Sequence, residues 1–321
     1  MRGATSQIAL LLISLAALLL LPSASAARGL KTKPIDAGRS QRLDLPDALV
    51  GPESVAFDGR GGGPYVGVSD GRVLRWGGAG AGWTTFAYSP SYAKNNCSST
   101  PSELPTAATE SSCGRPLGLR FHRASGDLYI ADAYMGLMRA GPGGGAAEVL
   151  VKEADGAPLR FTNGVDVDQV TGEVYFSDSS ATYTRAQHQM VTASGDATGR
   201  VMNSDRTHLV VALTGPCKLL KYGIGGPKAG TSEPFADLPG YPDNVRADGK
   251  GGYWVGLHRE KNELPFGPDS HLVAIRLGAD GKVQQEMKGP KDVRPSEVVE
   301  RKDGKLWIGS IELPYVGIIS A

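Results

Sequence analysis

Residues Thr162–Asp178 read TNGVDVDQVTGEVYFSD, and this stretch decides the fold. Apolar and polar residues alternate in its first part, a turn leads to Gly172, and a second apolar run ends at Asp178. Alternation with a period of two is typical of a β-strand with one buried face, and glycine often marks the turn between two such strands. The stretch therefore predicts two antiparallel strands joined by a short turn.

The same strand–turn–strand pattern recurs along the chain, without a helical period of comparable length. First strands of this form lie at Pro52–Asp58, Pro116–Phe121, Pro242–Asp248 and Pro295–Glu300, and second strands follow at Gly63–Val68, Gly126–Asp132, Gly252–Gly256 and Gly304–Gly309. Repeats of about 40 to 60 residues built from short antiparallel strands are typical of β-propellers. The sequence therefore predicts an all-β propeller.

The spacing of the repeats gives the number of blades. The interval from Asn163 to Asp243 is 80 residues, the longest between equivalent positions, and it contains a second-strand candidate at His208–Ala212 but no first strand. We interpret it as two units, one of them truncated around residues 200–215, which makes six blades in total. A strand near Arg42–Leu45 is expected to complete the last blade and close the ring.

Composition and charge exclude several other classes of protein. The 321 residues carry a formal net charge of +1, so a nucleic-acid partner is not expected. Hydrophobic residues make up 40% and charged residues 21%, which argues against disorder and against a polytopic membrane protein. The 44 glycines follow no fixed period and indicate many tight turns.

The N-terminus has the features of a secretory signal peptide. Arg2 precedes an apolar run at Ile8–Leu21, and the small residues Ser23–Ala26 form a cleavage site. We expect residues 1–26 to be the signal peptide, 27–40 a lead-in and 41–321 the propeller. The alternative is a retained membrane anchor, but the run is short of the ~20 residues that span a bilayer. The expected location is the secretory pathway, in the vacuole, the endoplasmic reticulum or outside the cell.

The cysteines fit an oxidising compartment. Cys97 and Cys113 flank a polar loop, and we expect them to form a disulfide. Cys217 is left over and is expected to be a buried, inert thiol. Asn96 begins an Asn-Cys-Ser sequon and is a candidate glycosylation site.

Polar residues recur at the start of the first strands, which in a propeller meet at one mouth of the central channel. One equivalent position holds Glu53, Leu117, Asn163, Asp243 and Ser296, and the next holds Ser54, Gly118, Gly164, Asn244 and Glu297. Carboxylates and amides crowded together in this way must be hydrogen-bonded, metal-bound or catalytic, because leaving them unpaired costs free energy.

Several motifs carry a resemblance to a known family. They lie at Cys113–Gly118, Phe161–Asp168, Val174–Ser180, Leu238–Val245 and Asp303–Gly309. With these motifs the chain resembles plant strictosidine synthase-like proteins over most of residues 40–320. The resemblance implies a six-bladed propeller related to calcium-dependent lactonases and paraoxonases, in a secretory, vacuolar or endoplasmic-reticulum setting in a plant.

The resemblance also implies a catalytic residue. Strictosidine synthase condenses an amine with an aldehyde and uses one glutamate of the last blade as acid and base, and that glutamate aligns with Glu297. One carboxyl can serve both steps if its pKa lies close to the working pH. The alternative is that Glu297 is a structural residue paired with Arg294 or Arg246.

Two departures from the family pattern argue against strictosidine formation itself. The true synthases have a histidine two positions before the glutamate, where this chain has Pro295. About two dozen residues that relatives carry after Gly199–Met202 are also absent, in agreement with the truncated unit. Loss of an inner strand leaves sheet edges unpaired or distorts a blade.

The lactonase relatives imply a rival site. They hold Ca²⁺ with Glu, Asn and Asp at the starts of inner strands, and Glu53, Asn163 and Asp243 stand at the matching positions, with Asn244 beside them. Such oxygen ligands suit Ca²⁺, which can polarise an ester or lactone carbonyl. The absent segment is where another asparagine ligand normally lies. The alternative is a hydrogen-bonded polar ring without metal, so no cofactor is certain and Ca²⁺ is the candidate.

The sequence thus predicts a monomeric, secretory-pathway enzyme that acts on a small molecule, by amine–aldehyde condensation or by hydrolysis. Tyr134, which follows a strand end, and Asn244 are the candidate substrate-binding residues. A calcium-dependent lactonase or esterase is one alternative, and a non-catalytic propeller that acts in binding or plant development is another. No stable membrane insertion is expected after signal cleavage.

Overall fold

The computed structural model describes residues 33–95, 97, 106–196, 198–202, 208–261 and 270–320. They belong to the contact unit Thr32–Ala321. Strands dominate this unit and the few helices are short, which confirms the all-β prediction. The predicted signal peptide, residues 1–26, and Asn96 lie outside the described residues. No helix within the described ranges is long and apolar enough to cross a membrane.

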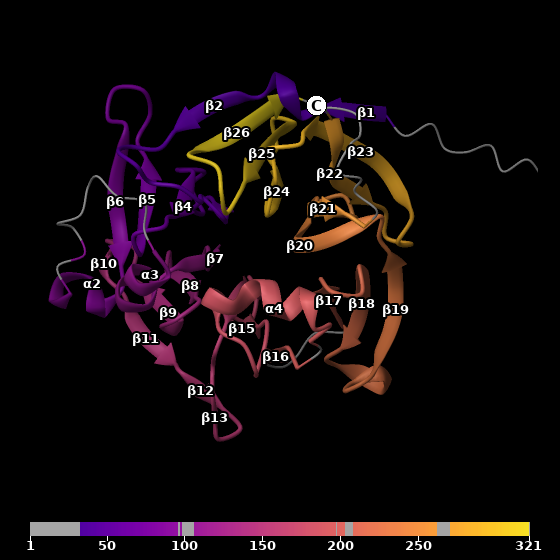
Figure 1. Cartoon of the computed structure of the whole chain (residues 1–321), viewed down its shortest axis with the longest axis horizontal. Coiled ribbons are helices and arrows are strands. Elements are labelled where there is room, and N and C mark those ends of the chain that lie inside the picture. Colours follow the sequence, from indigo (N-terminus) through magenta and orange to yellow (C-terminus); the bar gives the residue numbers. More distant parts are fainter. Residues whose placement is uncertain are drawn as a thin grey trace, which may run out of the picture. The chain divides into compact units, whose positions relative to one another are not determined.

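Six sheets of three or more strands follow one another along the described chain (Figure 1). Sheet 1 contains β3 (Val55–Ala56), β4 (Tyr65–Gly67), β5 (Arg72–Trp76), β6 (Trp83–Tyr88) and β10 (Gly145–Ala146). Sheet 2 contains β7 (Pro116–Phe121), β8 (Leu128–Asp132), β9 (Gly136–Ala140) and β11 (Glu148–Val151). Sheet 3 contains β14 (Thr162–Val167), β15 (Val174–Asp178) and β16 (Arg200–Met202).

The second half of the chain supplies the other three sheets. Sheet 4 contains β17 (His208–Leu213), β18 (Lys218–Gly223) and β19 (Ser232–Asp237). Sheet 5 contains β20 (Gly240–Ala247), β21 (Tyr253–Glu260), β22 (Ser270–Leu277), β23 (Val283–Pro290) and β1 (Lys33–Asp36). Sheet 6 contains β24 (Glu297–Glu300), β25 (Lys305–Gly309), β26 (Tyr315–Ser320) and β2 (Gln41–Asp44).

Short elements lie in the connections between strands of the described chain. They are the α-helices α2 (Pro90–Lys94), α3 (Ala107–Cys113) and α4 (His188–Ala193), the 3₁₀ helices η1 (Ala37–Arg39), η3 (Arg185–Gln187) and η4 (Gly226–Lys228), and the hairpin of β12 (Glu153–Ala154) with β13 (Ala157–Pro158).

The sheets of this unit surround a common centre, which is the arrangement of a β-propeller (Figure 1). Five of them begin with an inner strand: β3, β7, β14, β20 and β24. Each of four inner strands packs on the second strand of the preceding sheet, in the pairs β4–β7, β8–β14, β21–β24 and β25–β3. Sheet 4 begins instead with β17, which packs on β20 as a second strand does. The sixfold blade count stays a prediction.

The N-terminal segment closes the ring. β2 pairs antiparallel with β26, with Gln41 opposite Ile318 and Asp44 opposite Tyr315, which confirms the closing strand expected near residues 42–45. β1, which falls in the predicted lead-in 27–40, pairs in parallel with β23. Segments from the two ends of the chain thus share sheet 6, and opening that sheet would require breaking backbone hydrogen bonds along β2.

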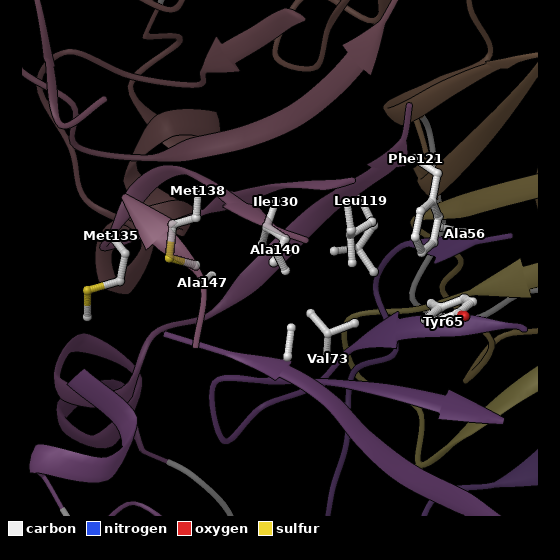
Figure 2. Close-up of a cluster of buried hydrophobic side chains, with 12 residues drawn as sticks. Ala56, Tyr65, Val73, Leu119, Phe121, Ile130, Met135, Met138, Ala140 and Ala147 are labelled. Atoms are coloured by element: carbon white, nitrogen blue, oxygen red, sulfur yellow. The ribbon is translucent and has the colours of Figure 1, made fainter. Parts of the chain in front are cut away.

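Apolar clusters fill the interfaces between neighbouring sheets. Figure 2 shows the one between sheets 1 and 2, where Tyr65 and Phe121 meet edge to face with ring centroids 4.7 Å apart. Other clusters join sheets 2 and 3, 4 and 5, 5 and 6, and 6 and 1. Among the described residues, the interface between sheets 3 and 4 is the one without such a cluster. This is the place where an inner strand of sheet 4 would lie.

The inner strands approach the preceding sheets closely enough to require glycine. A Cβ on Gly256 in β21 would lie 2.7 Å from the carbonyl oxygen of Ser296, and one on Gly309 in β25 would lie 2.2 Å from that of Glu53. Ser177 holds the corresponding place on β15. The Ser177 side chain, which is larger than that of glycine, fits at this position because, among the described residues, no inner strand packs on that face of β15.

The predicted disulfide is confirmed. Cys97 and Cys113, the last residue of α3, are bonded, with their Cα atoms 5.9 Å apart. Cys217 is a free thiol that is buried, and burial raises the pKa of this thiol. A buried thiol with a raised pKa is a poor nucleophile, in line with the inert role expected for it.

We expect Gly256→Ala to lower the free energy of unfolding by about 1–3 kcal/mol, because the new methyl group would press on the backbone that leads into β24. Ser177→Thr adds one methyl group on the face that has no inner strand and should change stability by less than about 1 kcal/mol. Urea unfolding of both variants measures this difference. Equal losses would mean that the face of Ser177 is as tightly packed as that of Gly256.

Candidate functional site

The starts of the inner strands bring polar side chains together near the centre of the propeller. Asn244 in β20 donates a hydrogen bond from Nδ2 to Oε1 of Glu53, which lies just before β3, at 2.8 Å. The backbone N–H of Asn244 donates to the carbonyl of Ser296 at 2.9 Å, and the Ser296 hydroxyl donates to the carbonyl of Glu53 at 2.7 Å. Sheets 5, 6 and 1 are thus joined at the predicted positions.

Glu297, the predicted catalytic residue, is fully buried at the start of β24. Its Oε2 accepts hydrogen bonds from the N–H of Val55 at 2.5 Å and from the hydroxyl of Ser54 at 3.2 Å. Its Oε1 forms an ion pair with Nε of Arg246. Both oxygens therefore have partners, as the structural alternative requires, and the partner is Arg246 rather than Arg294. A catalytic role for Glu297 stays a prediction.

The guanidinium of Arg246 makes further contacts around the centre. Its Nη2 donates to the hydroxyl of Ser54 at 3.0 Å and lies 3.4 Å from the carbonyl of Leu119, and its Nη1 lies 3.5 Å from the carbonyl of Val165. One side chain from sheet 5 thus contacts segments of four other sheets. The alternation of β20 places Arg246 on the same face as Asn244, and this is the signal in the sequence that points to it.

Glu53 combines burial with an unsatisfied oxygen. Its side chain is 1% exposed, and its Oε2 has no hydrogen-bond partner among the described residues. Burial raises the pKa of Glu53 well above its ordinary value, and the nearby carboxyls of Asp243 and Glu297 raise it further. A ligand that brings positive charge or a hydrogen-bond donor to Oε2 would relieve both effects.

Asp243 precedes Asn244 in β20 and is partly accessible from the cavity at the centre. Desolvation raises the pKa of its carboxyl to about 7; Glu297 adds to the rise and Arg185 opposes it. A carboxyl that titrates near neutral pH while open to a cavity can accept and return a proton during a reaction.

Asn163 in β14 supplies another unsatisfied acceptor. Its Nδ2 donates to the hydroxyl of Ser179 at 3.1 Å, while its Oδ1 is buried without a partner in the part of the chain that the structure describes. Among the described residues, the unpartnered side-chain atoms of Glu53 and Asn163 are both oxygens. Within the same described ranges, no three His, Cys, Asp or Glu side chains form a metal-binding group, so a cation here would depend on asparagine oxygen as well as carboxylate.

The two predicted substrate-binding residues lie in different surroundings. Asn244 lines the central cavity with Asp243. Tyr134 follows β8 and packs against the buried cluster of Leu117, Ala133 and Phe161; its hydroxyl is buried without a partner among the described residues. The structure does not place Tyr134 in the lining of that cavity.

Arg185 in η3 is a residue that the sequence did not reveal. It is close enough to Asp243 to lower the pKa of that carboxyl, and its Nε is buried without a hydrogen-bond partner in the described chain. It lies in a connection between strands, where neither alternation nor repeat spacing marks a residue. Only folding brings the Arg185 guanidinium close to the Asp243 carboxyl.

A cavity of about 310 Å³ opens beside this group of residues. It is lined by Asn163–Asp166 of β14, by Tyr175–Ser177 of β15, by His208–Ala212 of β17 and by Asp243–Ala247 of β20. Its volume lies at the lower end of the range of small-molecule sites. The cavity lies at the interface between sheets 3 and 4. Among the described residues, this interface has no apolar cluster.

Comparison with known proteins gives the family. A model described as strictosidine synthase matches residues 163–218, and one described as strictosidine synthase-like, N-terminal, matches residues 38–76. In Arabidopsis thaliana, Protein STRICTOSIDINE SYNTHASE-LIKE 10 is 41% identical over 321 residues, which cover 84% of this chain and 84% of that protein. Protein STRICTOSIDINE SYNTHASE-LIKE 3 is 40% identical over 333 residues, with 87% and 85% covered. The chain belongs to the strictosidine synthase-like family.

Solved structures place this family member among lactonase-like propellers. A gluconolactonase from Xanthomonas campestris matches with a TM-score of 0.54 and 15% identity over 88% of this chain and 90% of that one. A calcium-binding regucalcin from Agrobacterium tumefaciens matches with a TM-score of 0.57 and 15% identity over 89% and 95%. At this identity the likeness concerns the fold. It agrees with the propeller fold that the sequence motifs implied.

We expect Glu297→Gln to lower the free energy of unfolding by about 3–5 kcal/mol, because it leaves the Arg246 charge near the centre without its partner. The control is Glu148→Gln, which removes the same charge from an exposed pair with Arg139 and should change little. Urea unfolding measures both. A Glu297→Gln protein that is as stable as the wild type but inactive would support catalysis by Glu297 instead.

We expect the stability of Asp243→Asn, relative to wild type, to rise between pH 4 and pH 8. The folded protein holds the Asp243 proton up to a pKa of about 7, whereas the unfolded chain releases it near pH 4, so wild-type stability falls across this window. The variant lacks this loss, which is on the order of 2–4 kcal/mol. Urea unfolding with EDTA present at several pH values measures the difference, and a pH-independent difference would contradict the raised pKa.

Proposed function

We propose that the protein is an enzyme that acts on a small molecule at the centre of the propeller and hydrolyses an ester or a lactone. The observation that carries this proposal is a pair of buried oxygens that have no hydrogen-bond partner among the described residues, Oε2 of Glu53 and Oδ1 of Asn163, in the same region as the Asp243 carboxyl. Unpaired buried oxygens destabilise a fold, so a site that retains them is best explained by a ligand that they bind.

A divalent cation with oxygen ligands fits this set of residues. Glu53, Asn163 and Asp243 would hold it, with water or substrate completing the six to eight ligands that Ca²⁺ takes. When bound, Ca²⁺ would supply a Lewis acid that polarises the carbonyl group of an ester or lactone. Burial is the main cause of the raised pKa of Glu53 and of Asp243, and neighbouring carboxylates add to it; a bound cation would oppose both effects.

The side chains of the chain itself have separate roles in this proposal. Asn244 holds Oε1 of Glu53 and so directs Oε2 to the ligand. Asp243, with a pKa of about 7, exchanges a proton with water near neutral pH. Arg185 adds positive charge beside Asp243 and favours its ionised form. Arg246 and Glu297 hold the inner strands in place around them.

Names among the solved neighbours suggest which substrates to try first. One neighbour is described as a gluconolactonase and another as a calcium-binding protein. Both are similar to this chain in fold, so lactones with Ca²⁺ are the first conditions for an assay.

Amine–aldehyde condensation at Glu297 is the second candidate activity, and family membership favours it. It would require Glu297 to exchange one of its partners for the substrate amine, because both oxygens are occupied. Strictosidine formation itself is not proposed. A non-catalytic role in binding or plant development is the alternative if no turnover is found.

The proposal also includes the setting of the enzyme. We propose that residues 1–26 direct the chain into the secretory pathway and that the mature protein is monomeric, with sheet 4 as a sixth, reduced blade. The disulfide supports an oxidising compartment. The contact of β17 with β20 supports the sixth blade, because second strands make this contact in the other sheets.

We expect excess Ca²⁺ to raise the melting temperature of the EDTA-treated protein by several degrees, because a cation that binds only the folded state stabilises it. Glu53→Gln and Asp243→Asn should lose most of this rise, and Glu148→Gln should retain it. Differential scanning calorimetry measures the shift, and a pH-stat measures hydrolysis of δ-valerolactone. A cooperative transition that does not respond to Ca²⁺, together with no hydrolysis, would rule out the proposed hydrolase.

A further inference from the structure

The cavity beside the candidate site lies where, among the described residues, sheet 4 has no inner strand. Within the same residues β17 pairs with β18. The cavity lies along β17 and reaches sheet 3 on the opposite side. In the other sheets an inner strand occupies the corresponding position.

One wall of the cavity is formed by β17. Val210 and Ala212 pack into the cluster between sheets 4 and 5. Because side chains alternate along a strand, Leu209 and Val211 point to the other face, toward sheet 3. Both line the cavity and both are only partly buried, so two aliphatic side chains lack a full set of packing partners.

The facing wall comes from β15. Val174 and Phe176 pack against sheet 2, so Tyr175 and Ser177 face sheet 4, and both line the cavity. The Ser177 hydroxyl is satisfied by the N–H of Gly164 at 2.9 Å. The flank of the Tyr175 ring therefore stands across from the aliphatic side chains of β17, which makes this part of the cavity apolar.

The inner end of the cavity is polar and belongs to the candidate site. Asn163, Asp243 and Asn244 line it. A molecule in the cavity would thus meet oxygen atoms at one end and apolar walls along the rest. Small-molecule sites commonly have this composition, with an apolar lining and a few polar groups that fix orientation.

We propose that the space left by the absent inner strand is a substrate subsite, which takes an alkyl or aryl side group attached to the carbonyl-bearing end of the substrate. This inference rests on the proposed function, because it places the reacting carbonyl at Asn163 and Asp243. The substrate class is an ester or lactone with an apolar substituent of several carbons. The volume of about 310 Å³ fits a small molecule of this size.

The test uses binding of compounds that cannot be hydrolysed. The probes are 2-alkylcyclohexanones from methyl to hexyl, titrated into the mature protein with Ca²⁺ by isothermal calorimetry. The Kd is expected to fall about fourfold for each methylene group that enters the cavity. Val211→Phe fills the space between the walls and should remove this dependence on chain length.

Matched variants separate the subsite from general effects. Val170→Phe makes the same substitution at a valine that is 82% exposed, and it should bind the series as the wild type does. Leu209→Phe is a second filling variant in case Val211→Phe fails to fold, which a thermal melt would show. Equal Kd values across the series, no binding of any probe, or unchanged chain-length dependence in the folded filling variants would each overturn the proposal.

Two further outcomes separate the small-molecule subsite from strand addition and from the hydrolase. Displacement of the hexyl compound by the peptide acetyl-Val-Thr-Val-Thr-Val-amide would point to strand addition at β17 and would overturn the small-molecule subsite. If chain-length dependence holds but Ca²⁺ neither stabilises the protein nor supports hydrolysis, the proposed hydrolase fails and the cavity stands as a small-molecule site.

Discussion

The rest of the structure depends on the ion pair between Arg246 and Glu297. Glu297 is fully buried, and Arg246 of sheet 5 reaches segments of four other sheets through Glu297, Ser54 and the carbonyls of Leu119 and Val165. A charged pair near the centre of a ring is stable only while every partner keeps its place, because removing one leaves a desolvated charge. The inner strands are thus held at a fixed distance from the centre, and the residues that start them keep a fixed geometry.

This constraint separates the structural carboxylates from those available for chemistry. Glu297 has hydrogen-bond or ion-pair partners at both oxygens, whereas Glu53 has one oxygen without a partner among the described residues. Desolvation and the repulsion of neighbouring carboxylates raise the pKa of Glu53 and of Asp243. The same network that stabilises the ring therefore leaves a small set of acceptor oxygens poised for a ligand.

The described residues show no inner strand in sheet 4, and this sets the interface between sheets 3 and 4 apart from the others. Elsewhere each pair of neighbouring sheets is joined by an apolar cluster, and glycines such as Gly256 and Gly309 allow backbone contact. Between sheets 3 and 4 the described residues leave a cavity instead, with Ser177 where other sheets carry a smaller residue. This cavity is continuous with the candidate site, because Asn163, Asp243 and Asn244 line it, while the pairing of β2 with β26 closes the ring.

The sequence by itself determined the elements of the fold. Alternation along residues such as Thr162–Asp178 depends on neighbours in the chain, so strands, turns, the disulfide and the family motifs could be predicted from it. Which polar residues converge also followed from the repeat. The tertiary structure alone decided their partners, because these lie far away in sequence: Asn244 bonds Glu53 across 191 positions, and Ser54 bonds Glu297 across 243. The local sequence does not specify contacts between residues so far apart in the chain. The oxygens of Glu53 and Asn163 that have no partner among the described residues, the position of Arg185 and the cavity could therefore be found only in the folded chain.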